Sequence, residues 1–128
     1  MHKSLAKAEL AVMNLLWHMV DRLTAREIRE RLYPDETKAQ HGTVQRLLQR
    51  LEDKGFVNRD KRLSTHSFSP ALSLQDYAGQ RLESLAHELT DDSFVPLLAH
   101  LIEQKKVSRE DVERMRDVLD SYEKDTSS

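Results

Sequence analysis

Cysteine is absent from this 128-residue chain, so disulfide bonds, cysteine-ligated zinc or copper and a thiol nucleophile are excluded. No apolar run is long enough to cross a membrane, and the N-terminus has no apolar signal-peptide segment. These absences fit a protein that works in the reducing cytoplasm, which is where we expect it, without membrane insertion.

Signatures of catalysis are also missing. The sequence contains no HExxH metalloprotease motif, no phosphate-binding loop and no nucleophile elbow. Its six histidines lack close ligand spacing, and the carboxylates are spaced as on solvated helix faces. We therefore expect no enzyme activity, no resident metal and no cofactor. A metal site assembled across a dimer is the one alternative that the histidines leave open.

Apolar surface is scarce, because 38% of the residues are hydrophobic and 33% are charged. A chain of this length forms one domain, or two small ones, and a small polar chain often completes its core by forming an oligomer. The charge is divided unevenly. Residues 1–72 carry 13 Lys/Arg against 9 Asp/Glu, whereas residues 73–128 carry 7 against 13. This asymmetry suggests that only the first half meets a polyanion, although chance segregation of surface charge is the simpler alternative.

Residues 43–55, TVQRLLQRLEDKG, predict an amphipathic helix that begins near His41 or Gly42 and ends at Lys54-Gly55. Its apolar residues recur at helical spacing: Val44, Leu47, Leu48 and Leu51. Its other face presents side chains that hydrogen-bond base edges and phosphates, namely Gln45, Arg46, Gln49 and Arg50. This pattern suits the second helix of a helix-turn-helix, although the outer face of an ordinary surface helix is also charged.

Two helices are predicted before this one. Residues 5–20 have apolar residues on two faces, as in a helix at the centre of a bundle, and Trp17 is expected in the core. Thr24 and Glu27 form a capping-box pattern that begins a second helix, and Pro34 ends it. Residues 35–40 are expected to form a polar loop.

A β-hairpin is predicted after the third helix. Residues 56–60 and 65–69 alternate apolar and polar side chains around a KRLS segment. Three helices followed by a hairpin with a basic tip make a winged helix. Its wing would bring cations to the DNA backbone or an adjacent minor groove: Arg59, Lys61 and Arg62. A Lys-Arg pair in a loop can also be merely solvated.

Beyond Pro70 the pattern is purely helical, so we expect a winged-helix DNA-binding domain over residues 1–72 and a helical dimerisation domain over residues 73–128. Three short helices that each bury one face would leave apolar stripes exposed, and a twofold dimer of interlocking tails would cover them. The alternative is a tail folded back onto the first half. The expected interface residues are Leu82, Leu85, Leu97, Leu98, Leu101, Val112, Met115 and Leu119.

The chain resembles the BlaI/MecI/CopY family of bacterial repressors over nearly its whole length. The resemblance rests on AELAVMNLLW, LTAREIRERL and TVQRLLQRLEDKGFVNRD in that order, and on LLAHLIEQKKVSREDVERMRDVL in the tail. It implies a mainly α protein with a small β-hairpin: a winged helix-turn-helix followed by a three-helix dimerisation region. It further implies a homodimeric repressor on palindromic double-stranded operator DNA, with Thr43, Gln45, Arg46 and Arg50 on the reading face.

The sequence departs from the family pattern in ways that bear on its regulation. Copper-responsive members carry a C-terminal cysteine cluster, so their thiolate switch is excluded here. Members of the antibiotic-resistance branch are cleaved at an Asn-Phe bond, and this chain has His100-Leu101 at the corresponding place. Control by a membrane sensor protease is compatible with the resemblance but has no support in these residues. The alternative function is that of a winged-helix adaptor without sequence-specific DNA binding.

Overall fold

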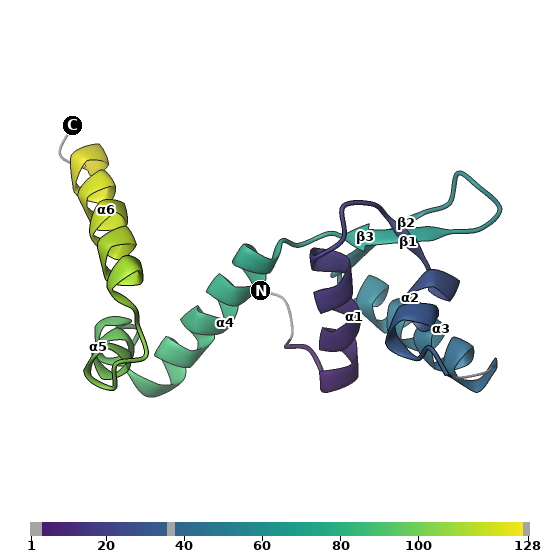
Figure 1. The fold of residues 1–128 in the computed structure, drawn as a ribbon, viewed down its shortest axis with the longest axis horizontal. Coiled ribbons are helices and arrows are strands. Elements are labelled where there is room, and N and C mark those ends of the chain that lie inside the picture. Colours follow the sequence, from purple (N-terminus) through teal and green to yellow (C-terminus); the bar gives the residue numbers. More distant parts are fainter. Residues whose placement is uncertain (1–3, 36–37, 127–128) are drawn as a thin grey trace. The chain divides into compact units, whose positions relative to one another are not determined.

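The computed structural model describes residues 4–35 and 38–126, which form six helices and a three-stranded antiparallel sheet (Figure 1). This confirms the expected fold class, a mainly helical chain that combines a winged helix-turn-helix with C-terminal helices. In chain order the elements are α1 Lys7–Trp17, β1 Leu23–Thr24, α2 Ala25–Leu32, α3 Lys38–Asp53, β2 Val57–Asp60, β3 Ser67–Pro70, α4 Leu74–Leu89, α5 Val95–Glu103 and α6 Arg109–Thr126.

The chain divides into two compact units, Met1–Leu82 (unit 1) and Glu83–Ser128 (unit 2). The division falls inside α4, whereas the sequence predicts a domain boundary between residues 72 and 73. The first turns of α4 belong to unit 1, and they and the segment before them contact the rest of that unit through hydrogen bonds and ring contacts. The Trp17 indole N–H donates to the Leu72 carbonyl at 2.8 Å, and the Leu5 N–H donates to the Tyr77 hydroxyl at 3.2 Å. The Tyr77 ring also packs against Trp17 and Phe56.

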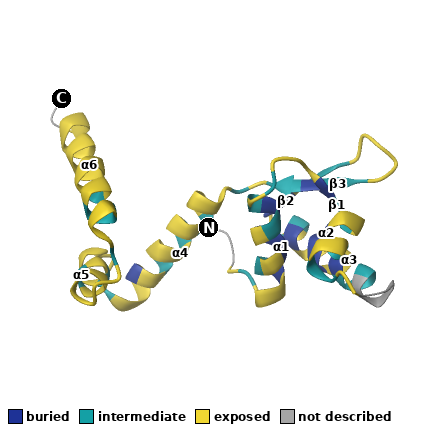
Figure 2. Cartoon of the chain, viewed as in Figure 1, coloured by how far each residue is buried: buried dark blue, intermediate teal, exposed yellow. Residues whose placement is uncertain are grey.

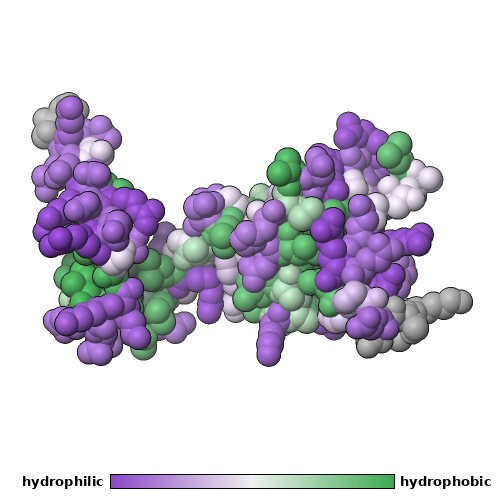
Figure 3. Space-filling view, viewed as in Figure 1, coloured by the Kyte–Doolittle hydropathy of each residue, from purple (hydrophilic) through white to green (hydrophobic). Residues whose placement is uncertain are grey.

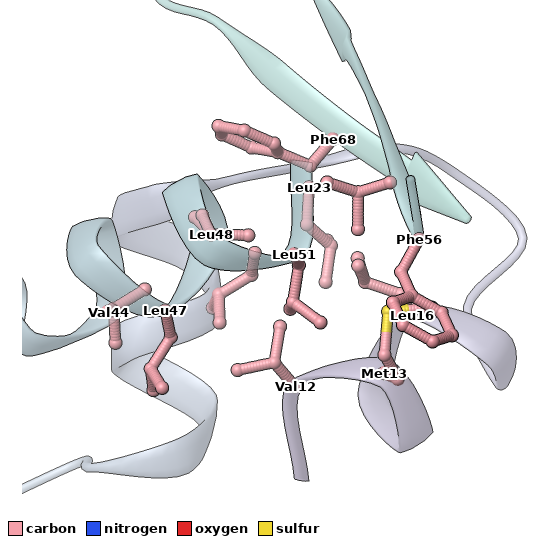
Figure 4. Close-up of a cluster of buried hydrophobic side chains, with 12 residues drawn as sticks. Val12, Met13, Leu16, Leu23, Val44, Leu47, Leu48, Leu51, Phe56 and Phe68 are labelled. Carbon is pink, nitrogen blue, oxygen red and sulfur yellow. The ribbon is translucent and has the colours of Figure 1, made fainter. Parts of the chain in front are cut away.

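The core of unit 1 is built around α3. The apolar stripe predicted on this helix is buried throughout, each residue being at most 5% exposed: Val44, Leu47, Leu48 and Leu51. Each such side chain contributes roughly 1.5–3 kcal/mol when removed from water. Figure 4 shows the stripe converging with side chains of α1 and the sheet, and the dark blue of Figure 2 marks the same buried layer. The partners are Val12, Met13, Leu16, Leu23, Ile28, Phe56, Val57 and Phe68.

Several boundaries differ from the sequence expectations. Helix α3 begins at Lys38, so the expected start at His41 or Gly42 is wrong, and Gly42 lies inside the helix. Lysine, alanine and glutamine favour helices, which explains the earlier start. Helix α1 ends at Trp17, three residues before its expected end at Val20. The capping box of α2 is confirmed, since the Thr24 hydroxyl accepts the Glu27 N–H and the Glu27 carboxylate accepts the Thr24 N–H.

The sheet has the order β1-β3-β2, and β2 and β3 form the predicted hairpin. Strand β1 was not predicted, because two residues are too short to show alternation. It pairs Leu23 with Phe68 and Thr24 with Ser67, so the start of α2 is joined to the hairpin. Gly55, with a φ of 84°, makes the left-handed turn from α3 into β2, as expected from the Lys54-Gly55 stop.

Unit 2 has little core of its own. Its one buried hydrophobic residue among those described is Ala86 of α4, and no described residue of α5 or α6 is buried. The leucines Leu98, Leu101 and Leu119 are 39–58% exposed. Figure 3 shows hydrophobic side chains at the surface around α5. No helix in the described part of the chain is both long and apolar enough to cross a membrane.

A buried ion pair joins the start of α1 to the end of α3. The Glu9 carboxylate is 1% exposed and accepts a hydrogen bond from the Ala6 N–H at 2.8 Å. The Lys54 ammonium donates to its two oxygens, to Oε1 at 2.8 Å and to Oε2 at 2.9 Å. Burial raises the pKa of Glu9. The hydrogen bonds from Lys54 and Ala6 and the positive charges of Lys54 and Arg50 outweigh that effect, so its pKa lies below the ordinary value of 4.5.

Lys54→Met should lower the free energy of unfolding by about 3 kcal/mol, because it leaves the Glu9 carboxylate buried without its ammonium partner. Glu9→Gln is the matched control. It keeps an acceptor for the Ala6 N–H and lets Lys54, whose side chain is 26% exposed, turn to water, so it should cost less. Urea unfolding at pH 7 measures both. Equal losses would contradict an ion pair held at this site.

The same pair should make stability depend on acid pH. Because the folded-state pKa of Glu9 is lowered, its contribution is present above the ordinary value of 4.5 and is lost as pH falls through the folded-state pKa. Urea unfolding of the wild type and of Glu9→Gln between pH 3 and 7 should show the two stabilities converging as the solution becomes more acidic. Parallel curves would mean that Glu9 does not titrate with folding.

Candidate nucleic-acid interface

The outer face of α3 carries the side chains that the sequence assigns to DNA. Gln45, Arg46, Gln49 and Arg50 are all exposed, on the side of the helix opposite its buried stripe. Three of them form hydrogen bonds within α3: Gln45 with His41 at 3.1 Å, Arg46 with Thr43 at 3.3 Å, and Gln49 with Asp53 at 2.9 Å. The charge of Arg50 acts on Glu9 of α1. Exposed bonds of this kind are weak, so an external partner can replace them at little cost.

A groove of about 470 Å³ opens beside this face, and we call it the α3–wing groove. It lies between the first turn of α2, the outer face of α3 and the loop that joins β2 to β3. Its ionisable lining residues are two arginines and two histidines, with no carboxylate among them. The lining residues are Thr24, Ala25, Arg26, His41, Gln45, Leu48, Gln49, Arg59, Ser64, Thr65, His66 and Phe68. Both arginines pair with carboxylates that lie outside the lining, Arg26 with Glu30 and Arg59 with Glu52, so the groove offers hydrogen-bond donors beside the outer face of α3.

The wing is the β2–β3 hairpin with its connecting loop. In Figure 1 the loop and the first turns of α3 project from the same side of unit 1. Lys61 and Arg62, both assigned to DNA from the sequence, are exposed in this loop. The Asp60 carboxylate accepts the Arg62 backbone N–H at 3.0 Å and its guanidinium at 2.6 Å, and it also pairs with Arg22. The Arg62 hydrogen bonds hold the pKa of Asp60 well below its usual range.

Arg59 has a different environment from the other two wing cations. Its register opposite Phe68 puts it on the inner face of the sheet, where its guanidinium lies 4.6 Å from the Phe68 ring centre. It donates to Glu52 of α3 at 3.0 Å and to Nδ1 of His66 at 3.2 Å, and its side chain is 19% exposed. Arg59 therefore joins the wing to the end of α3 from within the groove, and its direct contact with DNA stays a prediction.

Sequence reasoning missed several of these residues. Arg26, His41 and His66 line the α3–wing groove only through folding. Arg22 pairs with Asp60 of the wing, 38 residues further along the chain. The Arg26–Glu30 spacing signalled only a surface ion pair, which is present at 3.0 Å. No group of three or more His, Asp or Glu residues that could hold a metal occurs within residues 4–35 and 38–126.

Comparison with known proteins relates the chain to bacterial repressors. The penicillinase repressor family matches residues 5–121. The methicillin resistance regulatory protein MecI of Staphylococcus aureus is 24% identical over 115 residues, which cover 90% of this chain and 92% of the relative. The MecI proteins of Staphylococcus epidermidis and Mammaliicoccus sciuri show the same identity and coverage.

Arg59→Met tests whether Arg59 joins the wing to α3. Methionine keeps an apolar stem over Phe68 but removes the bonds to Glu52 and His66, so the free energy of unfolding should fall by about 1–2 kcal/mol. Arg62→Met, which removes a cation whose side chain is 81% exposed, is the control and should change stability less. Thermal or urea unfolding decides between them. A loss no larger for Arg59 than for Arg62 would contradict this assignment.

Proposed function

The chain belongs to the penicillinase repressor family of transcriptional regulators, and we propose that it acts as a homodimer that occupies a palindromic operator through α3 and the wing. The observation that carries this proposal is the two-sided character of α3. Its apolar stripe is buried in the core, while its Gln/Arg face is exposed beside a groove whose ionisable lining residues are arginines and histidines. An adaptor that binds only proteins has no need of such a face.

In the proposed complex α3 lies in the major groove. Arginine reads guanine through O6 and N7, and glutamine reads adenine through N6 and N7, each good pair giving about 1–3 kcal/mol of discrimination. Arg46 and Arg50 would contact guanine or phosphate, and Gln45 and Gln49 would contact adenine. Thr43, half-buried on the first half of the helix, completes the reading face.

The wing supplies affinity that does not depend on sequence. Lys61 and Arg62 are exposed cations, and each phosphate they neutralise releases counterions and makes binding weaker at higher salt. Arg59 acts by a different route. By joining the wing to Glu52 at the end of α3, it fixes the distance between the two DNA-contacting elements.

Dimerisation is proposed through the apolar residues of the last three helices. An isolated copy would expose Leu82, Leu85, Leu98, Leu101 and Leu119, each 39–58% accessible, together with the half-buried Leu97, Val112 and Met115. Exposure of this kind is typical of a surface that another chain covers, and a second copy is the partner that a palindromic operator requires. Two half-sites about 10 base pairs apart would then each receive one α3.

Release from the operator would follow loss of the dimer, because one subunit makes half of the contacts. Cleavage of the tail by a sensor protease is one route. The bond that corresponds to the cleaved bond of resistance regulators, His100–Leu101, lies inside α5. A protease needs an extended substrate, so cleavage there would require α5 to unfold locally first.

Arg50→Ala should weaken binding to the promoter region of the protein's own operon about 10-fold or more, because a buried base or phosphate contact is lost. Arg31→Ala is the control, since it removes the same charge from an exposed position at the end of α2. Fluorescence anisotropy over a salt titration, with scrambled DNA as competitor, measures both. Unchanged affinity of the Arg50 variant would remove it from the reading face, and equal wild-type binding to both DNAs would contradict operator recognition.

Leu98→Asp should shift the protein toward monomer in sedimentation equilibrium and weaken its binding to a palindrome while sparing its binding to a single half-site. The reason is that a carboxylate would be buried in the proposed interface. Val20→Asp is the matched control, because Val20 is 99% exposed in unit 1 and outside the tail. A Leu98 variant that remains dimeric would contradict the proposed interface.

A further inference from the structure

Leu63 lies in the wing loop with its side chain 77% exposed. All residues from Lys61 to Thr65 are exposed, and Leu63 is the one apolar residue among them. A single exposed leucine is unremarkable on a general surface. Here, however, it follows two cations on the element proposed to contact DNA, so its position is the informative feature.

The loop backbone is held by hydrogen bonds up to the residue before Leu63. The residue immediately before it, Arg62, is tied to Asp60 through its backbone N–H and its guanidinium. Asp60 is held in turn by Arg22, which precedes β1. These bonds order the backbone up to the leucine, which reduces the conformational entropy lost when the loop meets a partner.

We propose that Leu63 inserts into the minor groove of operator DNA beside the major-groove site of α3, and that it selects for DNA shape at that position. This inference rests on the proposed function and adds a residue that determines specificity. Apolar side chains in the minor groove contact sugars and partly unstack base steps, which is cheapest at flexible pyrimidine–purine steps. Lys61 and Arg62 would hold the flanking phosphates, so the cations provide affinity and the leucine provides selectivity.

Leu63→Ser separates these two roles. It should weaken operator binding about 10-fold, the loss expected when a leucine contact is removed from an apolar site. The slope of binding against salt should stay unchanged, because no charge is removed. Lys61→Ala should instead lower that slope by about one phosphate contact. Val20→Ser, which changes a 99% exposed side chain outside the wing, should alter neither. An unchanged melting temperature checks the fold of each variant.

A change in the DNA tests the groove itself. Adenines flanking the α3 site are replaced by 2,6-diaminopurine one at a time, in separate duplexes. Each replacement adds an amino group in the minor groove and leaves the major-groove edge intact. Wild-type binding should fall at one flanking step, and the Leu63→Ser variant should be insensitive there. Equal sensitivity of the two proteins, or wild-type affinity of the Leu63 variant, would overturn the proposal and leave Leu63 to contacts with other proteins. A wild-type protein that binds no DNA selectively would instead overturn the proposed function, and this inference with it.

Discussion

The structure of unit 1 depends on one requirement, that α3 bury one face while presenting the other. The stripe from Val44 to Leu51 fills the space between α1, α2 and the sheet, so the helix cannot rotate without exposing leucine. The Glu9–Lys54 pair fixes the last turn of α3 against the first turn of α1. With those contacts made, the directions of the Gln/Arg side chains are determined, and the remaining elements serve to hold the wing beside them.

Carboxylates organise the cations around this helix. Glu52 holds Arg59, Asp60 holds Arg22 and Arg62, and Glu9 holds Lys54. Three carboxylates thus position four cations, and residues 1–72 still carry more basic than acidic side chains. The pairs differ in what they do for stability. The pairs of the buried Glu9 and the half-buried Glu52 stabilise the fold. The pair of the exposed Arg62 with Asp60 orients its side chain but adds little to the free energy of unfolding, because solvent screens the charges.

Patterns within one element could be predicted from the sequence, whereas contacts between elements could not. The period of α3, the capping box of α2, the Gly55 turn and the hairpin all have local signals, and each is present. Strand β1 has no such signal, because two residues pair only once β3 is in place. The burial of Glu9 has no local signal, because it depends on Lys54, 45 positions away. Arg59 was predicted only as a wing cation, because its place on the inner face of the sheet depends on strand register. The apolar stripes of unit 2 were predictable, whereas their burial against a second copy is a proposal about contacts that lie outside a single chain.

Selection of DNA from a random-sequence library by the full-length protein, followed by footprinting of the enriched duplexes, would show whether two copies of α3 bind a palindrome. A homodimer with one α3 in each of two major grooves should enrich two inverted copies of a short motif with centres about 10 base pairs apart. Guanines protected in each copy should be those whose methylation at N7 blocks binding, since N7 lies in the major groove. A library that yields no motif, or a single unrepeated motif protected by one subunit, would contradict the account.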